Sequence, residues 1–519
     1  MKAQSNVILR GKPEESVSLR PFASLRVTIV LFYCLLLTSP AFAFQPSALS
    51  KKPVPASLKQ GIDSIIQNRC LSDAKVGIKI VSLKTGETVY ERNSDDLLIP
   101  ASNMKLITSA AALSRLKPNY KFKTTVAHDG TIDGNILNGN LYIKGYGDPK
   151  LVTEELLLVV REIRNSGIDE ITGDIVADDS FFDSERTGKG WKLDDDNSRA
   201  YNARIGALSL NFNTITVYVD SAESHRERPK VITNPPTSFV EVINKAVTNR
   251  RRVGTTITVD RIEDGGGDKI IVSGEVTTGK KRMHYYRNIS NPPLYTATVF
   301  KEFLEREGIT IKGNIRTGIQ PEGTEEFLDH ESVPLSIIVR DLNKISNNFI
   351  AEQILKTMGA EIKGAPGTTE KGLEVAEEYL NEIGIQKGTY TIADGSGLSR
   401  LNRITPSQIV KVLSSMYDDF RFQSEYISSL SVMGVDGSLK ERMNGSESQE
   451  MVRGKTGTLD GVSAISGYAA SPPIKNGGGG DLRGGIFAFS IIMNDFKCDV
   501  GKVWNIQNQI ISALTESGR

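Results

Sequence analysis

The sequence predicts an α+β fold with a β-rich central region, residues 121–327, between two regions built of helices and strands. Amphipathic helical patterns lie towards both ends of the chain, whereas residues 121–327 read mostly as short strands separated by Gly and Asp turns. The 519 residues are enough for roughly three domains, and a content of 39% hydrophobic and 24% charged residues is typical of globular proteins. We therefore expect several packed modules rather than a fibre or a disordered chain.

The first element is an apolar stretch typical of a secretory signal peptide. Residues 27–43 are almost wholly apolar, follow Arg20 and Arg26, and end in the small-residue site Ala41-Phe42-Ala43. The stretch is short for a comfortable membrane span. We predict cleavage after Ala43, giving residues 1–43 as a signal peptide and an exported protein in the periplasm or cell envelope. An uncleaved anchor is the alternative.

The charge balance bears on which partners the chain can bind, and the cysteine content on whether it forms a disulfide. Lys and Arg total 63 and Asp and Glu total 62, so the chain has no net field that would hold a nucleic acid. Cys34 lies in the predicted leader, which leaves Cys70 and Cys498 in an oxidising compartment. These two cysteines either form a disulfide or remain buried thiols, and the pattern alone does not decide between them.

The elements before residue 121 follow from local patterns. Apolar residues at helical spacing predict a helix over 57–68. Alternating apolar and polar residues predict strands over 74–83 and 88–92, joined by a turn that contains Gly86. A run rich in Ala and Leu then predicts a helix over 102–116.

Within residues 121–327 the patterns indicate one or two β-rich modules. Short β-branched runs predict strands at 141–144, 215–219 and 270–272. Helical spacing predicts one helix over 154–166 and another near 237–247.

After residue 327 the patterns return to helices and end with two strands and a last helix. We expect helices over 335–358, 369–383, 406–416 and 502–516, and strands over 461–470 and 484–494. The tetraglycine Gly477–Gly480 between those strands is not followed by Gly-Lys-Ser/Thr, which favours a flexible hairpin loop over a phosphate-binding loop. The last helix is amphipathic but lacks a basic face, which favours core packing and leaves peripheral membrane association unsupported.

Two common hydrolase designs find no support in the sequence. A zinc site needs His or Cys ligands at close spacing, and none of the four histidines has such a partner. The histidines are His128, His225, His284 and His330. A Ser-His-Asp hydrolase of the nucleophile-elbow type needs Gly-x-Ser-x-Gly, which does not occur.

Three short strings carry residues that can do chemistry. In Ser102-Asn103-Met104-Lys105, at a predicted helix start, a three-residue offset places hydroxyl and amine on one face. Ser346-Asn347-Asn348 lies within a helical pattern and supplies a second hydroxyl and an amide. Lys455-Thr456-Gly457-Thr458 precedes the strand predicted after Gly461, and its Gly lets a substrate backbone approach a sheet edge.

Each string alone has an ordinary structural interpretation. Ser102 alone reads as a helix N-cap, Ser346 as a polar helical residue and Lys455 as a solvated loop charge. Their order along the chain, their placement and the predicted export favour a shared active site instead.

The combined set resembles the signature of β-lactamases and penicillin-binding proteins. Ser102 and Ser346 are far apart in the sequence. In this the chain resembles the D-alanyl-D-alanine carboxypeptidases and endopeptidases of the class C low-molecular-mass penicillin-binding proteins, which carry β-rich insertions between the same two motifs. The resemblance spans nearly all of residues 50–519. Further matching strings are Gly147-Asp148-Pro149, Asp178-Asp179-Ser180-Phe181-Phe182, Ala207-Leu208-Ser209-Leu210-Asn211 and Asp394-Gly395-Ser396-Gly397-Leu398-Ser399-Arg400.

The resemblance implies a β-lactamase/transpeptidase-like domain interrupted by inserted β-rich domains. That domain would be a five-stranded antiparallel sheet with helices on both faces, made from residues 50–120 and 328–519 around the inserted domains at 121–327. In such a fold the first and last helices pack as neighbours, which would bring Cys70 towards Cys498.

The resemblance also implies an activity. It is that of a serine-type D-alanyl-D-alanine carboxypeptidase or endopeptidase acting on peptidoglycan stem peptides, with β-lactams as covalent inhibitors and with no cofactor or metal. Ser102 would be the nucleophile and Lys105 its base. Ser346 would pass a proton to the leaving amine, Lys455 would tune that hydroxyl, and Asn348 would hold the substrate and Lys105.

Substrate-binding residues are implied in the same way, and they are Thr456, Gly457, Thr458, Leu398, Leu459 and Asp178. The backbone N–H groups of Ser102 and Thr458 would form the oxyanion hole, and the Thr456 and Thr458 hydroxyls would bind the substrate carboxylate. Leu398 and Leu459 would border the stem-peptide pocket. Asp178 would bind a free amino end of the substrate, although it also reads as a turn residue.

Two rival functions remain open at this point. The string Glu377-Glu378-Tyr379-Leu380-Asn381 matches the Glu-x-x-Leu-Asn of class A β-lactamases, but it lies in the amphipathic helix expected over 369–383. A non-catalytic module that binds cell-wall peptides is the second rival. The intact motifs argue against it.

Overall fold

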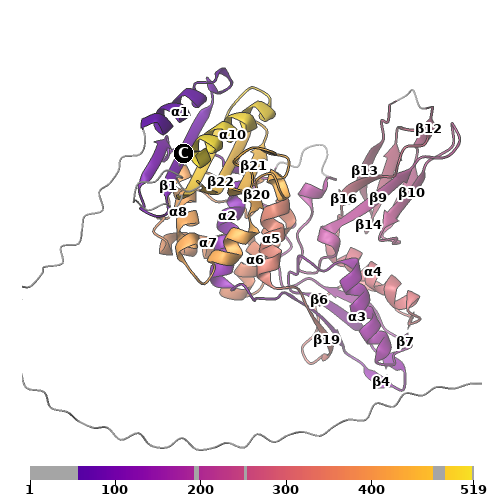
Figure 1. Cartoon of the computed structure of the whole chain (residues 1–519). Coiled ribbons are helices and arrows are strands. Elements are labelled where there is room, and N and C mark those ends of the chain that lie inside the picture. The colour runs from indigo at the N-terminus through magenta and orange to yellow at the C-terminus, as the bar shows by residue number, and fades with distance from the viewer. Residues whose placement is uncertain (1–55, 192–197, 251–253, 472–484, 517–519) are drawn as a thin grey trace, which may run out of the picture. The chain divides into compact units, whose positions relative to one another are not determined.

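A six-stranded antiparallel sheet organises the part of the chain on either side of the insert (Figure 1). The computed structural model describes residues 56–191, 198–250, 254–471 and 485–516. Within them the sheet has the order β2-β1-β23-β22-β21-β20. Its strands are β1 (Lys75–Ser82), β2 (Thr88–Arg92), β20 (Ser431–Val432), β21 (Val452–Leu459), β22 (Val462–Ala470) and β23 (Ile486–Asn494). Because β1 pairs with β23 along its whole length, the two ends of the chain build one sheet.

Helices cover both faces of this sheet, as the predicted transpeptidase-like architecture requires (Figure 1). One face packs against α1 (Ala56–Ile66) and α10 (Val500–Glu516), and its core includes Ile62, Ile78 and Ile506. The helices on the other side are α2 (Met104–Arg115), α5 (Leu335–Ile345), α6 (Asn348–Lys363), α7 (Thr369–Glu382), α8 (Pro406–Asp418) and α9 (Gln423–Ser429). The fold class expected from the sequence is confirmed, with the two-residue β20 as an added edge strand.

The insert contains a mixed sheet whose order is β18-β8-β6-β3-β19 and a smaller sheet whose order is β17-β7-β5-β4. The larger sheet consists of β3 (Lys123–His128), β6 (Leu141–Gly145), β8 (Ile175–Asp178), β18 (Ile315–Thr317) and β19 (Glu325–Glu331), and the smaller of β4 (Thr131–Asp133), β5 (Ile136–Asn138), β7 (Glu170–Ile171) and β17 (Thr310–Ile311). Two helices share their core, α3 (Thr153–Asn165) and α4 (Pro292–Arg306). β3 and β19 pair antiparallel, so the start and the end of the insert lie side by side, and the expected boundary at 327/328 falls inside β19.

Shorter sheets make up the rest of the insert that the structure describes. They are β10-β9-β16, β11-β14-β13 and β12-β15. Their strands are β9 (Thr214–Asp220), β10 (Lys230–Asn234), β11 (Val240–Asn244), β12 (Val247–Asn249), β13 (Thr258–Asp264), β14 (Gly267–Ser273), β15 (Glu275–Thr277) and β16 (Met283–Asn288). The insert and the six-stranded domain belong to one compact unit.

The helix expected near 237–247 is wrong, because this segment forms β11 and β12. β11 pairs with β14 in parallel, and its β-branched residues Val240, Val242 and Ile243 suit a strand. The helix α4 was not expected from the sequence, since its first two residues are prolines. Proline is tolerated in the first helical turn, and the side chain of Asn291 caps this turn by accepting a hydrogen bond from the Leu294 N–H.

The single helix expected over 335–358 is also wrong, because it is divided into α5 and α6. Ser346 adopts a left-handed conformation with φ 62°, which ends α5. Asn347 then caps α6 through a hydrogen bond from the Ile350 N–H to its side-chain oxygen. The Ser346-Asn347-Asn348 string therefore lies at a break between two helices, not within one.

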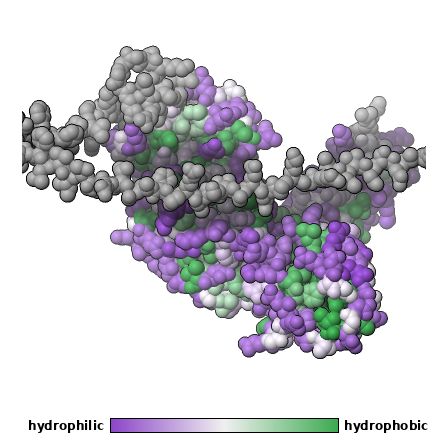
Figure 2. Space-filling view, turned by 60° about the horizontal axis from the view of Figure 1, so that its bottom comes forward, coloured by the Kyte–Doolittle hydropathy of each residue, from purple (hydrophilic) through white to green (hydrophobic). Residues whose placement is uncertain are grey.

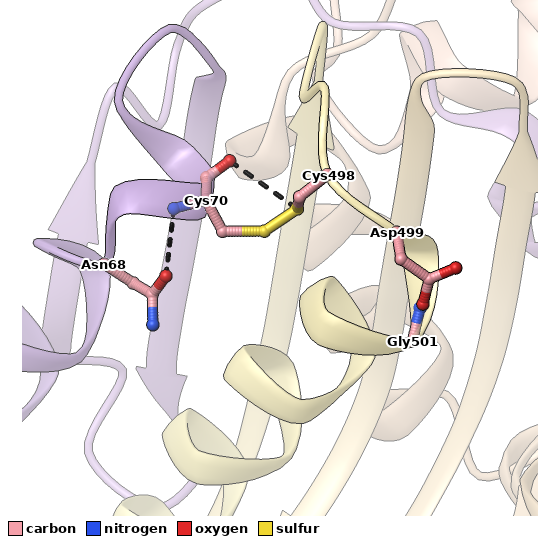
Figure 3. The surroundings of a disulfide bond; sticks show 5 residues. All are labelled: Asn68, Cys70, Cys498, Asp499 and Gly501. Carbon is pink, nitrogen blue, oxygen red and sulfur yellow. Dashed lines mark hydrogen bonds between the residues drawn. A yellow bond between two sulfur atoms is a disulfide. The ribbon is translucent and has the colours of Figure 1, made fainter.

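A disulfide joins Cys70 to Cys498 and ties the first helix to the last (Figure 3). The two Cα atoms are 5.6 Å apart, and 428 positions separate the cysteines along the chain. Asn68 accepts a hydrogen bond from the Cys70 N–H, and Asp499 accepts one from the Gly501 N–H at the start of α10. The implied proximity of the cysteines is confirmed, and the alternative of two buried free thiols is wrong.

The surface that Figure 2 shows is mostly hydrophilic, with hydrophobic residues in scattered groups. Across the described ranges, no helix has both the length and the apolar character needed to cross a bilayer. The predicted signal peptide and the tetraglycine Gly477–Gly480 lie outside the described residues.

Candidate active site

Ser102 lies in a 3₁₀ turn, η2 (Ala101–Asn103), that leads directly into α2. Asn103, not Ser102, occupies the N-cap position of α2, and its side chain makes no capping hydrogen bond. Ser102 is half-buried, and its hydroxyl oxygen accepts a hydrogen bond from Lys105 Nζ at 3.1 Å. The N-cap interpretation of Ser102 is therefore wrong, and its hydroxyl is paired with an amine one turn away.

Lys105 is fully buried and donates to oxygens from three different segments. Besides Ser102 Oγ, its Nζ lies 2.7 Å from Asn348 Oδ1 on α6 and 2.6 Å from the carbonyl oxygen of Ser396. Burial lowers the pKa of Lys105 to about 8, and the negative charges of Asp394 and Glu352 oppose this shift. Near neutral pH a fraction of Lys105 is therefore the neutral amine.

Ser346 and Lys455 form a second hydroxyl–amine pair at the same site. The fully buried Lys455 donates from Nζ to Ser346 Oγ at 2.7 Å and to the Thr456 carbonyl oxygen at 2.8 Å. Burial, together with the positive charge of Lys105, pushes the pKa of Lys455 well below its usual value. The positive charge of Lys105 is therefore felt at Lys455.

The segment Lys455-Thr456-Gly457-Thr458 lies inside β21, whereas the sequence led us to expect it before a strand. β20 pairs only with Arg453 and Gly454 of β21, so in the described chain no strand covers the edge from Lys455 to Leu459. Thr458 is exposed there, and the Thr456 hydroxyl donates to Ser438 Oγ at 2.7 Å. An edge that is free in this way can pair with an extended peptide.

Gly457 is the point at which β21 approaches η2. A β-carbon at this position would lie 2.7 Å from the Pro100 carbonyl oxygen and 2.9 Å from the Ser102 nitrogen. Such distances exclude a side chain without a local shift, so a glycine is needed for this close contact.

Leu398 and Leu459 lie on two segments that a hydrogen bond holds together. Arg400, two residues after Leu398, donates from Nη2 to the carbonyl oxygen of Asp460, one residue after Leu459. Both leucines are half-buried. Leu398 comes two residues after Ser396, whose carbonyl binds Lys105, and Leu459 comes four residues after Lys455 on β21.

Comparison with known proteins identifies the family. The family model described as D-Ala-D-Ala carboxypeptidase 3 (S13) matches residues 58–517. A D-alanyl-D-alanine carboxypeptidase from Actinomadura sp. (strain R39) is 35% identical over 486 residues, which is 91% of this chain and 86% of the relative. The chain belongs to the D-Ala-D-Ala carboxypeptidase 3 (S13) family.

More distant relatives agree with this assignment. The D-alanyl-D-alanine carboxypeptidase DacB of Haemophilus influenzae is 26% identical over 399 residues, covering 76% of this chain and 82% of the relative. The crystal structure of penicillin binding protein 4 from Haemophilus influenzae superimposes with a TM-score of 0.75 over 88% of this chain and 99% of that chain, at 22% identity. This S13 protein is thus a serine-type D-Ala-D-Ala peptidase with the fold of that structure.

Two of the residues singled out from the sequence, Asp178 and Glu377, have partners other than the residues of the two hydroxyl–amine pairs. Asp178 is fully buried at the end of β8, where its carboxylate accepts hydrogen bonds from the Ser180 and Gln320 N–H groups and pairs with Lys144 at 3.3 Å. Its oxygens are therefore already engaged by the insert itself. The Glu377–Asn381 string lies in α7, where Leu380 is buried and Glu377 pairs with Lys387 at 2.6 Å.

Sequence reasoning missed the polar groups that surround Lys105. Glu352 on α6 is fully buried and binds the backbone of Gly395 and Ser396. Its spacing of four residues from Asn348 was a usable signal, because i and i+4 residues share a helix face. Within the described residues, no group of three His, Cys, Asp or Glu side chains is placed to hold a metal ion.

The insert also reaches this site in the S13 protein. Asn348 Nδ2 donates to the carbonyl oxygen of Tyr201 at 3.1 Å, and Trp191 Nε1 donates to Asp394 at 2.9 Å. Both insert residues come from segments with no recognisable motif, so these contacts could not be predicted from the sequence.

Proposed function

We propose that Ser102 attacks the penultimate D-Ala carbonyl of a peptidoglycan stem peptide and forms an acyl-enzyme that water then hydrolyses. The observation that carries the proposal is the hydrogen bond between Lys105 Nζ and Ser102 Oγ at 3.1 Å, in a site where Lys105 has no contact with bulk water. A serine hydroxyl is a weak nucleophile until an adjacent base takes its proton.

Lys105 is the base in this proposal. Burial keeps the pKa of Lys105 near 8, so the neutral amine is accessible at physiological pH. The amide oxygen of Asn348 and the carbonyl of Ser396 hold Nζ in place, which leaves its lone pair directed to Ser102 once a proton is lost.

The oxyanion that forms on attack needs hydrogen-bond donors at a fixed position. We assign the backbone N–H groups of Ser102 and Thr458 to this role, because η2 and β21 meet at Gly457. Loss of one such donor typically costs about 2.7–4 kcal/mol of transition-state stabilisation.

Ser346 and Lys455 are assigned to the leaving group. As the C–N bond breaks, Ser346 relays a proton: its Oγ–H protonates the departing D-Ala amine, and Ser346 takes up in exchange the proton that Lys105 removed from Ser102. Lys455 at 2.7 Å stabilises the charge that develops on Ser346 during this transfer. A substrate carboxylate bound by Thr456 and Thr458 would favour the charged form of Lys455, since an opposite charge offsets its burial.

The substrate backbone is expected to lie along the free edge of β21, with Leu398 and Leu459 bordering its side chain. An apolar border of this kind suits the aliphatic part of a stem-peptide residue. Asp178 is left out of this proposal, because its carboxylate is bound within the insert.

The same attack accounts for β-lactams as covalent inhibitors. Ring opening by Ser102 leaves the amine part of the drug attached to the acyl group, so no small leaving group diffuses away. The adduct should therefore outlast the one formed with a peptide. We also propose that the protein is exported and acts in the periplasm or cell envelope after loss of residues 1–43, where peptidoglycan is available.

The test is the release of D-Ala from a pentapeptide that ends in D-Ala-D-Ala, measured for the wild type and for Ser102→Ala. The wild type should release D-Ala, and Ser102→Ala should release it at least about a thousandfold more slowly. Equal rates would contradict the assignment of Ser102. Cross-linked and uncross-linked muropeptides compared in the same assay separate endopeptidase from carboxypeptidase action.

A further inference from the structure

Glu352 is a fully buried carboxylate next to the proposed base, and none of the sequence motifs contains it. It lies on α6, four residues after Asn348. Its Oε1 accepts hydrogen bonds from the Ser396 N–H at 2.8 Å and the Gly395 N–H at 3.1 Å, and its Oε2 lies 3.2 Å from the Gly395 nitrogen. A buried charge is costly unless it is well paired, so this arrangement calls for an explanation.

The backbone that Glu352 binds is the same segment that contacts Lys105. The carbonyl oxygen of Ser396 accepts the hydrogen bond from Lys105 Nζ at 2.6 Å, and the Gly395 carbonyl accepts one from Thr108 Oγ1 at 2.7 Å. Glu352 therefore binds the backbone N–H groups of Gly395 and Ser396, while the carbonyl groups of the same two residues accept hydrogen bonds from side chains of α2. Moving the Glu352 carboxylate would move the acceptor that orients Lys105.

Glu352 accepts hydrogen bonds from the Gly395 and Ser396 N–H groups, and such donors favour the ionised form of a carboxyl group. Burial and the charge of Asp394 raise the pKa of Glu352 to about 8, and the hydrogen bonds from Ser396 and Gly395 oppose this shift. Its charge in turn favours the ammonium form of Lys105.

Other charged groups face this pair from the surrounding elements. Lys105 comes from α2, Asp394 from the loop before Leu398, and Lys455 from β21. Lys356, one turn further along α6, is bound by Asp183 and by the Glu185 carbonyl of the insert. Asp394 is occupied by other donors: Trp191 Nε1, Ser396 Oγ, the Gly397 and Ser399 N–H groups and Asn402 Nδ2.

We propose that Glu352 is a positioning residue for Lys105: its carboxyl group holds the Gly395–Ser396 backbone against Lys105 Nζ, and its ionised form favours the ammonium form of Lys105. The proposal rests on the proposed role of Lys105 as the base for Ser102. Glu352 touches neither substrate nor Ser102, so its effect passes through Lys105.

The test is the pH dependence of acylation by benzylpenicillin, followed for the wild type, Glu352→Gln and Glu352→Asp. Glu352→Gln removes a negative charge near Lys105, so the pH midpoint for acylation should fall by about 0.5–1 unit. Its maximal rate should fall by about tenfold or more, because the amide NH₂ opposes the backbone N–H donors. Glu352→Asp keeps the charge but withdraws the carboxylate, so its midpoint should match the wild type while its rate falls.

The matched control is Glu374→Gln, the same change at an exposed glutamate that pairs with Lys363 on the surface. Its midpoint and rate should equal those of the wild type. A Glu352→Gln enzyme with a lower rate and an unchanged midpoint would overturn the proposal and leave Glu352 a structural residue only. If Glu352→Gln does not fold, an unchanged rate in Glu352→Asp would overturn it.

The same experiment separates this inference from the function on which it rests. If benzylpenicillin does not acylate the wild type, the role of Ser102 and Lys105 is contradicted. If the wild type is acylated and only the Glu352 variants behave like the control, the catalytic assignment stands and the inference about Glu352 is wrong.

Discussion

Gly457 on β21 faces the backbone nitrogen of Ser102 so closely that a β-carbon at residue 457 would lie 2.9 Å from it. These residues come from opposite sides of the insert. Their contact joins the turn that carries the proposed nucleophile to the strand that carries Lys455 and Thr458. It thereby fixes the spacing between the two proposed oxyanion-hole donors.

We predict that Gly457→Ala lowers acylation by at least about a hundredfold, because the new methyl group would push β21 away from η2 and misplace one donor. Stopped-flow measurement of acylation by a chromogenic cephalosporin would check this. Gly454→Ala on the same strand is the control, since its β-carbon would come no closer than 3.4 Å to any neighbour. Equal rates for the two variants would contradict the argument.

The acylation rate of the wild type should rise with pH through a midpoint near 8. Burial lowers the pKa of Lys105 to about 8, and only the neutral amine above that pH can take the Ser102 proton. The pH profile of kcat/KM for a D-Ala-D-Ala peptide would test this. A midpoint near the ordinary lysine value of about 10.4, or a flat profile between pH 6 and 9, would contradict it.

Removal of the disulfide should destabilise the fold without abolishing the site. The Cys70–Cys498 bond closes a loop of 428 positions, and a native disulfide of this kind typically contributes about 2–5 kcal/mol. Urea unfolding of the wild type with and without a thiol reductant would measure the difference. Cys498→Ser should unfold, with or without reductant, at the urea concentration at which the reduced wild type unfolds. If the reductant still lowered the unfolding midpoint of this variant, the loss of stability would not come from the Cys70–Cys498 bond.

Asp148 offers a prediction about stability. It is almost fully buried, its Oδ1 accepts a hydrogen bond from the Lys150 N–H, and its Oδ2 has no partner in the described chain. Burial raises the pKa of Asp148 to about 7, so the folded protein holds a proton that the unfolded chain releases near pH 4. The stability linked to this proton is complete below about pH 4 and is lost as the pH rises through 7.

Asp148→Asn should therefore raise the melting temperature at pH 8 and change it much less at pH 5. The gain at pH 8 is at most about 4 kcal/mol, since one pKa unit corresponds to about 1.4 kcal/mol. Differential scanning calorimetry at both pH values would measure it. Asp133→Asn, on an exposed edge strand, is the control, and a similar effect at both pH values in Asp148→Asn would contradict the linkage.

The catalytic motifs were readable from the sequence because each is local. Ser102 and Lys105 share one turn, and Lys455 to Thr458 are consecutive. The conformation at Ser346 was not readable, since amphipathic spacing continues across residues 335–358 and hides the left-handed residue that ends α5. Helical patterning records which side chains are apolar, but a helix break depends on backbone angles and on the cap that Asn347 supplies.

Contacts between distant segments were beyond sequence reasoning for a different reason. Glu352 and Trp191 matter through backbone and carboxylate groups that only folding brings together. The segment over 237–247 was misjudged because a short apolar run fits both a helix and a strand, and pairing of β11 with β14 decides in favour of the strand. The helix α4 was missed for another reason: it begins with two prolines, which usually mark the end of a helix.

The central claim is that Ser102 is the residue acylated. Intact-protein mass spectrometry after incubation with benzylpenicillin tests it most directly. The account predicts that the wild type gains the mass of one penicilloyl group and that Ser102→Ala gains none. A wild type without an adduct, or an equal adduct on Ser102→Ala, would contradict it.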